Sequence, residues 1–163
     1  MLTDDDLVLY ETAAITLHLC DTHPRPALIP ALGTPQRARF YQWLVWLTNT
    51  LQATLIVYFY PERWVQPGDA AAATQVRAQA QERIGGMLDQ LDALVQRSGG
   101  PWLLGADYSA LDAYAFTLCR WTRNFSALPA RERPHLGPYL QRMLARPALV
   151  RVLQLEGLAP PFV

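Results

Sequence analysis

The chain has 163 residues, of which 51% are hydrophobic and 17% are charged, so it can bury one core and is excluded from the disordered class. Fourteen basic residues balance fourteen acidic ones, the formal net charge is +0, and no basic block is present, which excludes a nucleic-acid partner. All the basic residues are arginines, which excludes Schiff-base or phosphate-loop lysine chemistry from these residues.

Residues 7–10 form a short apolar run after the turn-like residues 4–6, so they are predicted to form a strand that enters from a hairpin, the only strand predicted. A helical pattern follows over residues 11–21 and ends at the proline-rich segment 22–35. A lone strand has no ladder partner and is unstable by itself. We therefore expect further strands to precede this sequence.

The rest of the chain is predicted to be helical. Thr34 is the expected N-cap of a long helix with Pro35 at its first position, and Pro61 ends it. Gly85-Gly86 lies inside a second long helix at a cost of roughly 1 kcal/mol per glycine, which predicts a close helix crossing or a kink. The predicted helices cover residues 34–60, 69–97, 109–124, 134–145 and 147–155. The predicted fold is an all-α bundle with one strand.

The thiols and the N-terminus predict a cytoplasmic protein. Cys20 and Cys119 lie far apart in apolar helical surroundings, which is typical of reduced thiols. The acidic N-terminus lacks the basic and apolar regions of a secretory signal. Residues 40–60 carry no formal charge and have the length of a membrane span, but the polar run 48–50 would lie near the bilayer centre. We therefore predict a buried helix and no membrane partner.

Glu11 and Thr12 place a carboxylate and a hydroxyl at the first turn of a helix, directly after the predicted strand. One interpretation is helix capping, since both side chains can satisfy the free amides of the first turn. The other is recognition of an amino acid zwitterion. The ligand's carboxylate would bind the helix N-terminus and the Thr12 hydroxyl, and Glu11 would pair with its ammonium group.

Ser109 and Asp112 have the spacing of a capping box, so a folding role is expected for both, and catalysis by Asp112 is not. No histidine has a Ser, Cys or Asp partner at an interpretable spacing, so no catalytic residue and no metal site is assigned.

An apolar ligand cleft is expected between the helices, lined by aromatic side chains of the long helix and of the helix that starts at Ser109. We assign its contacts to Trp46, Asn49 and Arg120, with Arg123 as a further polar candidate.

Taken in order, these features resemble the cytosolic glutathione transferase family in its bacterial forms. Residues 7–15, Leu-Val-Leu-Tyr-Glu-Thr-Ala-Ala-Ile, are similar to the last strand and third helix of its thioredoxin-like domain, where an acidic residue followed by Ser or Thr holds the γ-glutamyl end of glutathione. Glu11 and Thr12 occupy that pair. The resemblance implies a remnant of that domain over residues 1–24, a linker over 25–33 and a glutathione transferase C-terminal-like helical domain over 34–163.

The resemblance further implies glutathione as co-substrate, a small apolar electrophile and a homodimer. The family's thiol-activating Ser, Cys or Tyr and its cis-proline loop match no residue here, so we expect this chain alone to be inactive. Three interpretations stay open: a fragment of a complete transferase that conjugates glutathione to electrophiles, a truncated helical interaction module, or a carrier of an apolar ligand. Without preceding strands, the apolar surface of residues 7–15 is expected to promote dimerisation or aggregation.

Overall fold

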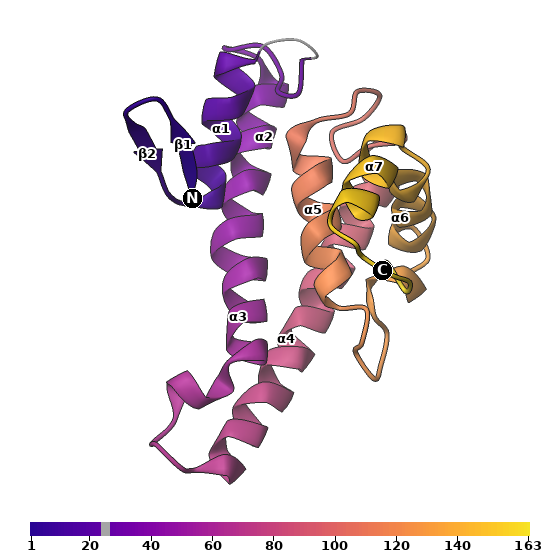
Figure 1. The fold of residues 1–163 in the computed structure, drawn as a ribbon. Helices are drawn as coiled ribbons and strands as arrows, with labels where there is room; N and C mark the ends of the chain where they lie inside the picture. The colour runs from indigo at the N-terminus through magenta and orange to yellow at the C-terminus, as the bar shows by residue number, and fades with distance from the viewer. Residues whose placement is uncertain (24–26) are drawn as a thin grey trace.

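The computed structural model describes residues 1–23 and 27–163, and it is mostly helical with a small two-stranded sheet (Figure 1). Its elements are β1 (Leu2–Asp4), β2 (Leu7–Leu9), α1 (Thr12–Thr22), α2 (Pro35–Trp46), the π-helix η1 (Leu47–Gln52), α3 (Ala53–Phe59), the 3-10 helix η2 (Pro61–Trp64), α4 (Ala70–Arg97), α5 (Ala110–Trp121), the 3-10 helix η3 (Ala130–Glu132), α6 (Leu136–Leu144) and α7 (Pro147–Leu155). The hairpin and α1 lie at one side of the molecule, and α6 and α7 lie at the other (Figure 1).

The N-terminal strand has a partner, which corrects the expectation of a single strand. β1 pairs antiparallel with β2, with Leu2 opposite Leu9 and Asp4 opposite Leu7. Asp4 also lies 3.2 Å from Nε2 of His18 on α1, so the hairpin is tied to the following helix by a polar contact as well as by the chain. Both strands are only three residues long and largely exposed, and this explains why alternation of apolar residues does not reveal β1.

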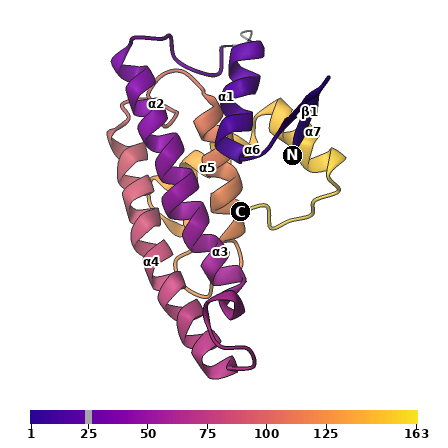
Figure 2. The ribbon, with the colours of Figure 1, turned by 90° about the vertical axis from the view of Figure 1, so that its left-hand side faces the viewer.

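The two longest helical segments, which we call rods, lie side by side in the bundle. The first consists of α2, η1 and α3, and the second, α4, runs beside it (Figures 1 and 2). The Thr34 side chain accepts a hydrogen bond of 3.2 Å from the amide of Arg37, Pro35 is the first helical residue, and Pro61 follows the rod, all as predicted. The long helix is interrupted by the π-helical turn η1, which the sequence pattern does not predict.

The glycine pair of α4 does not mark a close helix crossing. A Cβ atom at Gly85 would meet only the guanidinium of Arg133, at 3.7 Å, and a Cβ atom at Gly86 would meet nothing described within 4 Å. The Arg133 guanidinium instead donates to the Gly85 carbonyl at 3.1 Å and pairs with Asp89. The room left by Gly85 is therefore filled by a side chain from the segment that precedes α6.

Helix α5 lies at the centre of the core. Its apolar residues pack between the rods and α6, and the largest fully buried side chain of the molecule, Tyr139 of α6, reaches the start of α5. The Tyr139 hydroxyl donates to the Asp112 carboxylate at 3.0 Å, which ties α6 to the N-terminus of α5. The predicted helical bundle is confirmed in this region.

Part of the expected linker, residues 24–26, lies outside the described residues, and the boundaries 1–24, 25–33 and 34–163 stay a prediction. Within residues 1–23 and 27–163, no helix is both long enough and apolar enough to cross a membrane.

Candidate functional site

The N-terminus of α1 has an unusual backbone. Glu11 is the N-cap residue with φ 68° and ψ 119°, a conformation that a residue with a Cβ atom rarely adopts. Its side chain is exposed and makes no capping hydrogen bond to any residue that the structure describes. The structure therefore shows no hydrogen bond for the capping interpretation of Glu11, and the Glu11 side chain is exposed. Strain of this kind costs about 1–3 kcal/mol and is typical of functional sites.

A cavity of about 490 Å³ opens between α1 and α5 next to this turn, and we call it the α1–α5 cavity. It is lined by Thr12, Thr16, Leu19, Cys20, His23, Leu28, Gln52, Ala110, Ala113, Tyr114, Thr117, Leu118 and Trp121. Thr12, the second residue of the predicted pair, is on its rim and exposed. The structure thus places Thr12 at the edge of an open cavity, and Glu11 directly precedes it in the chain.

Three polar side chains from distant parts of the chain meet beside Thr12. The Tyr114 hydroxyl on α5 donates to the Gln52 amide oxygen on η1 and lies 3.3 Å from the Thr48 hydroxyl. Burial raises the pKa of Tyr114, nearby Thr48 and Thr12 hydroxyls oppose this, and the Glu11 carboxylate adds to it. Tyr114 is therefore a neutral hydroxyl group at neutral pH and can donate or accept a hydrogen bond at this edge of the cavity.

A second, larger cavity of about 750 Å³ lies between α3, α5 and α7, and we call it the α5–α7 cavity. Its wall is mainly apolar, with Ile56, Phe116, Leu149, Val152 and Leu153 among the lining residues. Ala113, Thr117 and Trp121 of α5 line both cavities. The two spaces therefore adjoin along one face of α5, so a ligand in one lies close to a ligand in the other.

The three residues expected to contact an electrophile do not come together. Arg120 lines the α5–α7 cavity. Trp46 packs edge-on against Trp43, with ring centroids 5.1 Å apart, in a separate groove between α2 and α4. Asn49 is exposed on η1. Of these residues, Arg120 is the one that the structure places at the larger cavity.

The sequence pattern missed the cluster of Thr48, Gln52 and Tyr114. Its one signal is the polar run within residues 48–50, which interrupts an apolar helix and coincides with η1. π-Helical turns are rare in proteins overall, but those that occur are often found at functional sites. Gln52 and Tyr114 are 62 positions apart, so the pairing arises from tertiary structure and has no local sequence signature.

The predicted capping box at α5 is confirmed, and its carboxylate is fully engaged. Asp112 accepts from the Ser109 amide at 2.8 Å and from the Leu103 amide at 2.9 Å. Burial raises the pKa of Asp112, and these hydrogen bonds and that of Tyr139 partly offset the effect. With both oxygens occupied and no exposed surface, Asp112 is a structural group.

Comparison with known proteins finds relatives over nearly the whole chain. Residues 74–150 match the family described as "Glutathione S-transferase, C-terminal domain". The chain is 27% identical over 158 residues to Glutathione S-transferase GstA of Escherichia coli O157:H7. This match covers 97% of this chain and 73% of the relative. A crystal structure of a glutathione transferase from Methylococcus capsulatus has a TM-score of 0.75 at 31% identity, over 95% of this chain and 71% of that chain.

A sphingomonad glutathione S-transferase complexed with glutathione has a TM-score of 0.74 at 26% identity, over 93% of this chain and 69% of that chain. The first two of these matches leave fewer than ten residues of this chain uncovered, so they extend beyond the helical bundle into the N-terminal region that carries Glu11 and Thr12.

Proposed function

This chain belongs to the glutathione transferase family, and from that premise we propose that it binds glutathione at the N-terminus of α1 and serves glutathione conjugation. The observation that carries the proposal is the exposed Glu11, whose strained backbone directly precedes Thr12 on the rim of the α1–α5 cavity. The sphingomonad relative, which is complexed with glutathione, supports the choice of ligand.

The γ-glutamyl end of glutathione is an amino acid zwitterion, and the start of α1 offers a group for each of its charges. The Glu11 carboxylate pairs with the ammonium group. The free amides of the first turn and the Thr12 hydroxyl bind the carboxylate, helped by the helix dipole of the 11-residue α1. Tyr114 lines the same cavity as Thr12 and can hydrogen-bond the peptide part of the ligand.

Conjugation needs a group that stabilises the glutathione thiolate, and in this proposal that group comes from outside these 163 residues. Glu11 has the wrong charge, because a nearby carboxylate raises the pKa of a thiol. The electrophile occupies the α5–α7 cavity, which adjoins the glutathione site along α5 and contains Arg120. Among the expected contacts Trp46, Asn49 and Arg120, the geometry favours Arg120.

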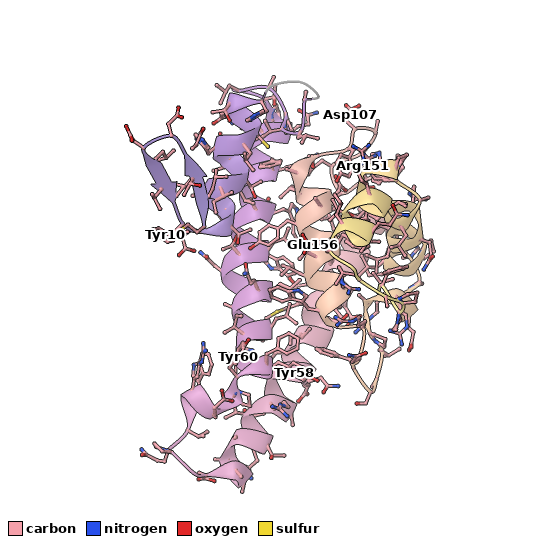
Figure 3. All side chains as sticks on the ribbon, in the orientation of Figure 1. Tyr10, Tyr58, Tyr60, Asp107, Arg151 and Glu156 are labelled. Carbon is pink, nitrogen blue, oxygen red and sulfur yellow. The ribbon has the colours of Figure 1, made fainter. Side chains whose placement is uncertain are left out.

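A second candidate is a non-catalytic interaction or ligand-binding module. Large apolar side chains of β2 and of the residue that follows it are exposed, which favours a protein partner or a second copy of this chain there: Leu7, Val8 and Tyr10. Tyr10 lies at the outer edge of the molecule, far from α7 (Figure 3). In both proposals the N-terminal unit is residues 1–24, the linker is 25–33 and the helical domain is 34–163. A cytoplasmic homodimer also remains a proposal.

The test is isothermal titration calorimetry of the 163-residue chain with glutathione. Glu11→Ala and Thr12→Ala should each weaken the affinity by about tenfold, because each removes a charge-assisted hydrogen bond. Asp6→Ala, which removes an exposed carboxylate of the hairpin turn, and Thr74→Ala, which removes an exposed hydroxyl of α4, serve as matched controls. A folded chain that binds no glutathione would reject the proposal and favour the interaction module.

A further inference from the structure

Helix α1 is held against the bundle by few buried side chains. Of its eleven residues, all of them described, Cys20 alone is buried, whereas seven of the twelve residues of α5 are buried. Ala13 and Leu17 pack against the core but stay partly exposed. The α1–α5 cavity of about 490 Å³ lies between the two helices, so their apolar contact is incomplete. A segment with so little buried surface opens locally at a lower free energy than the core does.

One buried guanidinium joins α1, the linker and α2. Arg37 lies in the first turn of α2 and is 7% exposed. Its Nη1 donates to the Pro30 carbonyl at 2.8 Å, and its Nη2 lies 3.6 Å from a carboxylate oxygen of Asp21 on α1. The other ion pairs of the described residues do not connect residues 1–23 with the rest of the chain. Arg37 is therefore the charged contact between α1 and the bundle in the part of the chain that the structure describes.

The described part of the linker is fixed to the bundle. The Ala110 amide, at the start of α5, donates to the Leu28 carbonyl at 2.8 Å, and Ile29 packs against the core. Together with the bond from Arg37 to the Pro30 carbonyl, these contacts hold residues 28–30 in place. Arg37 thus has one partner on the fixed linker and one on the weakly packed helix. The contact with α1 can break while the contact with the linker remains.

We propose that β1, β2 and α1 open from the bundle as one local unit, and that Arg37 is the latch that holds this unit closed by pairing with Asp21. Opening exposes the Cys20 thiol and separates Thr12 from Tyr114, which line the same cavity. The latch therefore controls entry to the α1–α5 cavity. This inference goes beyond the proposed function, because it does not depend on which ligand occupies the cavity.

The two thiols distinguish local opening from global unfolding. Cys20 is on α1 and 6% exposed, whereas Cys119 on α5 is fully buried. Local opening exposes Cys20 alone, and global unfolding exposes both. The experiment is labelling of the 163-residue chain at pH 8 with the uncharged disulfide dithiodipyridine, with mass spectrometry to assign the label to each cysteine.

Arg37→Gln should speed the labelling of Cys20 by about tenfold, because it removes the charged contacts with Asp21 and Pro30, and it should leave the rate at Cys119 within about twofold. Burial and the Asp21 carboxylate raise the pKa of Cys20, and Arg37 lowers it. Loss of the Arg37 charge would therefore slow any reaction of the thiol in the closed state. Faster labelling has the opposite sign, so it reports opening.

Arg39→Gln is the matched control, because Arg39 is exposed on the same helix and forms no ion pair with a described residue. It should change the Cys20 rate by less than about twofold. Asp21→Asn removes the partner on α1 and leaves the buried guanidinium in place. Because Asp21 is largely exposed, we expect a smaller effect, of about threefold.

Hydrogen exchange of the α1 amides is the second readout, since it does not depend on the pKa of the thiol. The exchange rates in α1 should rise by the same factors as the labelling rates, whereas those in the middle of α4 should not change. Where Arg37→Gln fails to fold, Asp21→Asn carries the test by this readout, and unchanged α1 exchange in that variant would overturn the proposal.

The proposal is also overturned if a folded Arg37→Gln chain leaves Cys20 labelling and α1 exchange unchanged, or if Arg39→Gln has an equal effect. Equal acceleration at Cys20 and Cys119 would overturn it too, because Arg37 would then stabilise the whole chain. The glutathione titration is a separate measurement. Its failure, with faster Cys20 labelling in Arg37→Gln, would reject the conjugation proposal and support the latch.

Discussion

Two helix starts in this molecule show opposite uses of a carboxylate. At α5, Asp112 is fully buried and accepts hydrogen bonds from the Ser109 and Leu103 amides, in a relaxed capping box. At α1, Glu11 is exposed, makes no capping bond to a described residue, and has a strained backbone with φ 68°. The Asp112 carboxylate thus accepts its hydrogen bonds from its own chain, whereas the Glu11 carboxylate makes no capping hydrogen bond to a described residue.

This difference distinguishes a carboxylate with a structural role from one without local partners, and it can be seen without sequence similarity. A carboxylate that satisfies neighbouring amides stabilises the chain and has nothing left for a ligand. A strained residue without a local partner lowers stability and persists because the surrounding structure holds it there. The contrast supports a folding role for Asp112 and leaves the proposed binding role of Glu11 open to test, and each substitution can be followed by its effect on stability.

The largest effect is expected for Asp112→Ala. The change leaves the Leu103 and Ser109 amides and the Tyr139 hydroxyl without their buried acceptor. We expect the free energy of unfolding to fall by about 3 kcal/mol, since buried unsatisfied donors each cost about 1 kcal/mol or more. Urea unfolding followed by circular dichroism measures this. Asp107→Ala, at an exposed position nearby, should change it by less than about 0.5 kcal/mol, and an equal loss in both would contradict the structural role.

A third helix start lies between these extremes. Thr34 caps α2 through one hydrogen bond from the Arg37 amide, at 3.2 Å. Thr34→Ala should therefore lower the free energy of unfolding by about 1 kcal/mol, the ordinary value for an N-cap. The control is Thr74→Ala, since the Thr74 hydroxyl only bonds back to the carbonyl of Ala70 within α4. No loss in the Thr34 variant would show that Pro35 alone defines this helix start.

Glu11→Gly should have the opposite sign. Glycine adopts positive φ without strain, so the free energy of unfolding should rise by about 0.5–1 kcal/mol even though glycine is more flexible in the unfolded chain. The same substitution should weaken glutathione binding, which no purely structural role predicts. Asp5→Gly, at φ 47° in the hairpin turn, is the control with a smaller expected gain, because Asp tolerates this region. A less stable Glu11→Gly chain would show that the Glu11 side chain has a structural partner.

The smallest effect concerns the two thiols, Cys20 on α1 and Cys119 on α5. Burial raises the pKa of Cys119 on α5 to about 12, so about one molecule in ten thousand carries its thiolate at pH 8. Burial also raises the pKa of Cys20 on α1, but Cys20 lines the α1–α5 cavity. A thiol-disulfide reagent at pH 8 should modify Cys20 slowly and leave Cys119 unmodified until urea is added. Rapid modification of Cys119 in the folded chain would mean that α5 opens.

The sequence predicts the features that depend on neighbouring residues. The Thr34 cap with Pro35, the Ser109 capping box and the long helix that begins after Asp69 are local patterns, and the structure contains each of them. β1 was missed because three half-polar residues have no periodicity to detect. Of the close helix crossing or kink expected at Gly85-Gly86, the crossing was wrong, because the Arg133 side chain from a distant segment lies beside Gly85.

The candidate site shows the same limit. Glu11 and Thr12 are adjacent in the chain, so they can be proposed from the sequence, and their binding role stays a prediction. The other site residues depend on which helices face one another in the fold. Tyr114 bonds Gln52, 62 positions away in the chain, whereas Trp46 and Arg120 line different cavities. Periodicity alone identifies a buried or polar face and does not say which cavity that face borders.

The π-helical turn η1 has a consequence for how this rod tolerates changes in length. Leu47, Leu51 and Leu55 are all fully buried at intervals of four, wider than the 3.6 residues of an α-helical turn, and the wide turn keeps them on one face. The turn thus acts as a built-in one-residue insertion. Deleting Asn49, which is exposed, would leave a regular α-helix in which α2 and α3 keep their facing, because η1 is the turn that holds the extra residue. When this rod is aligned with a relative that has an uninterrupted helix, a gap of one residue therefore belongs between Leu47 and Gln52.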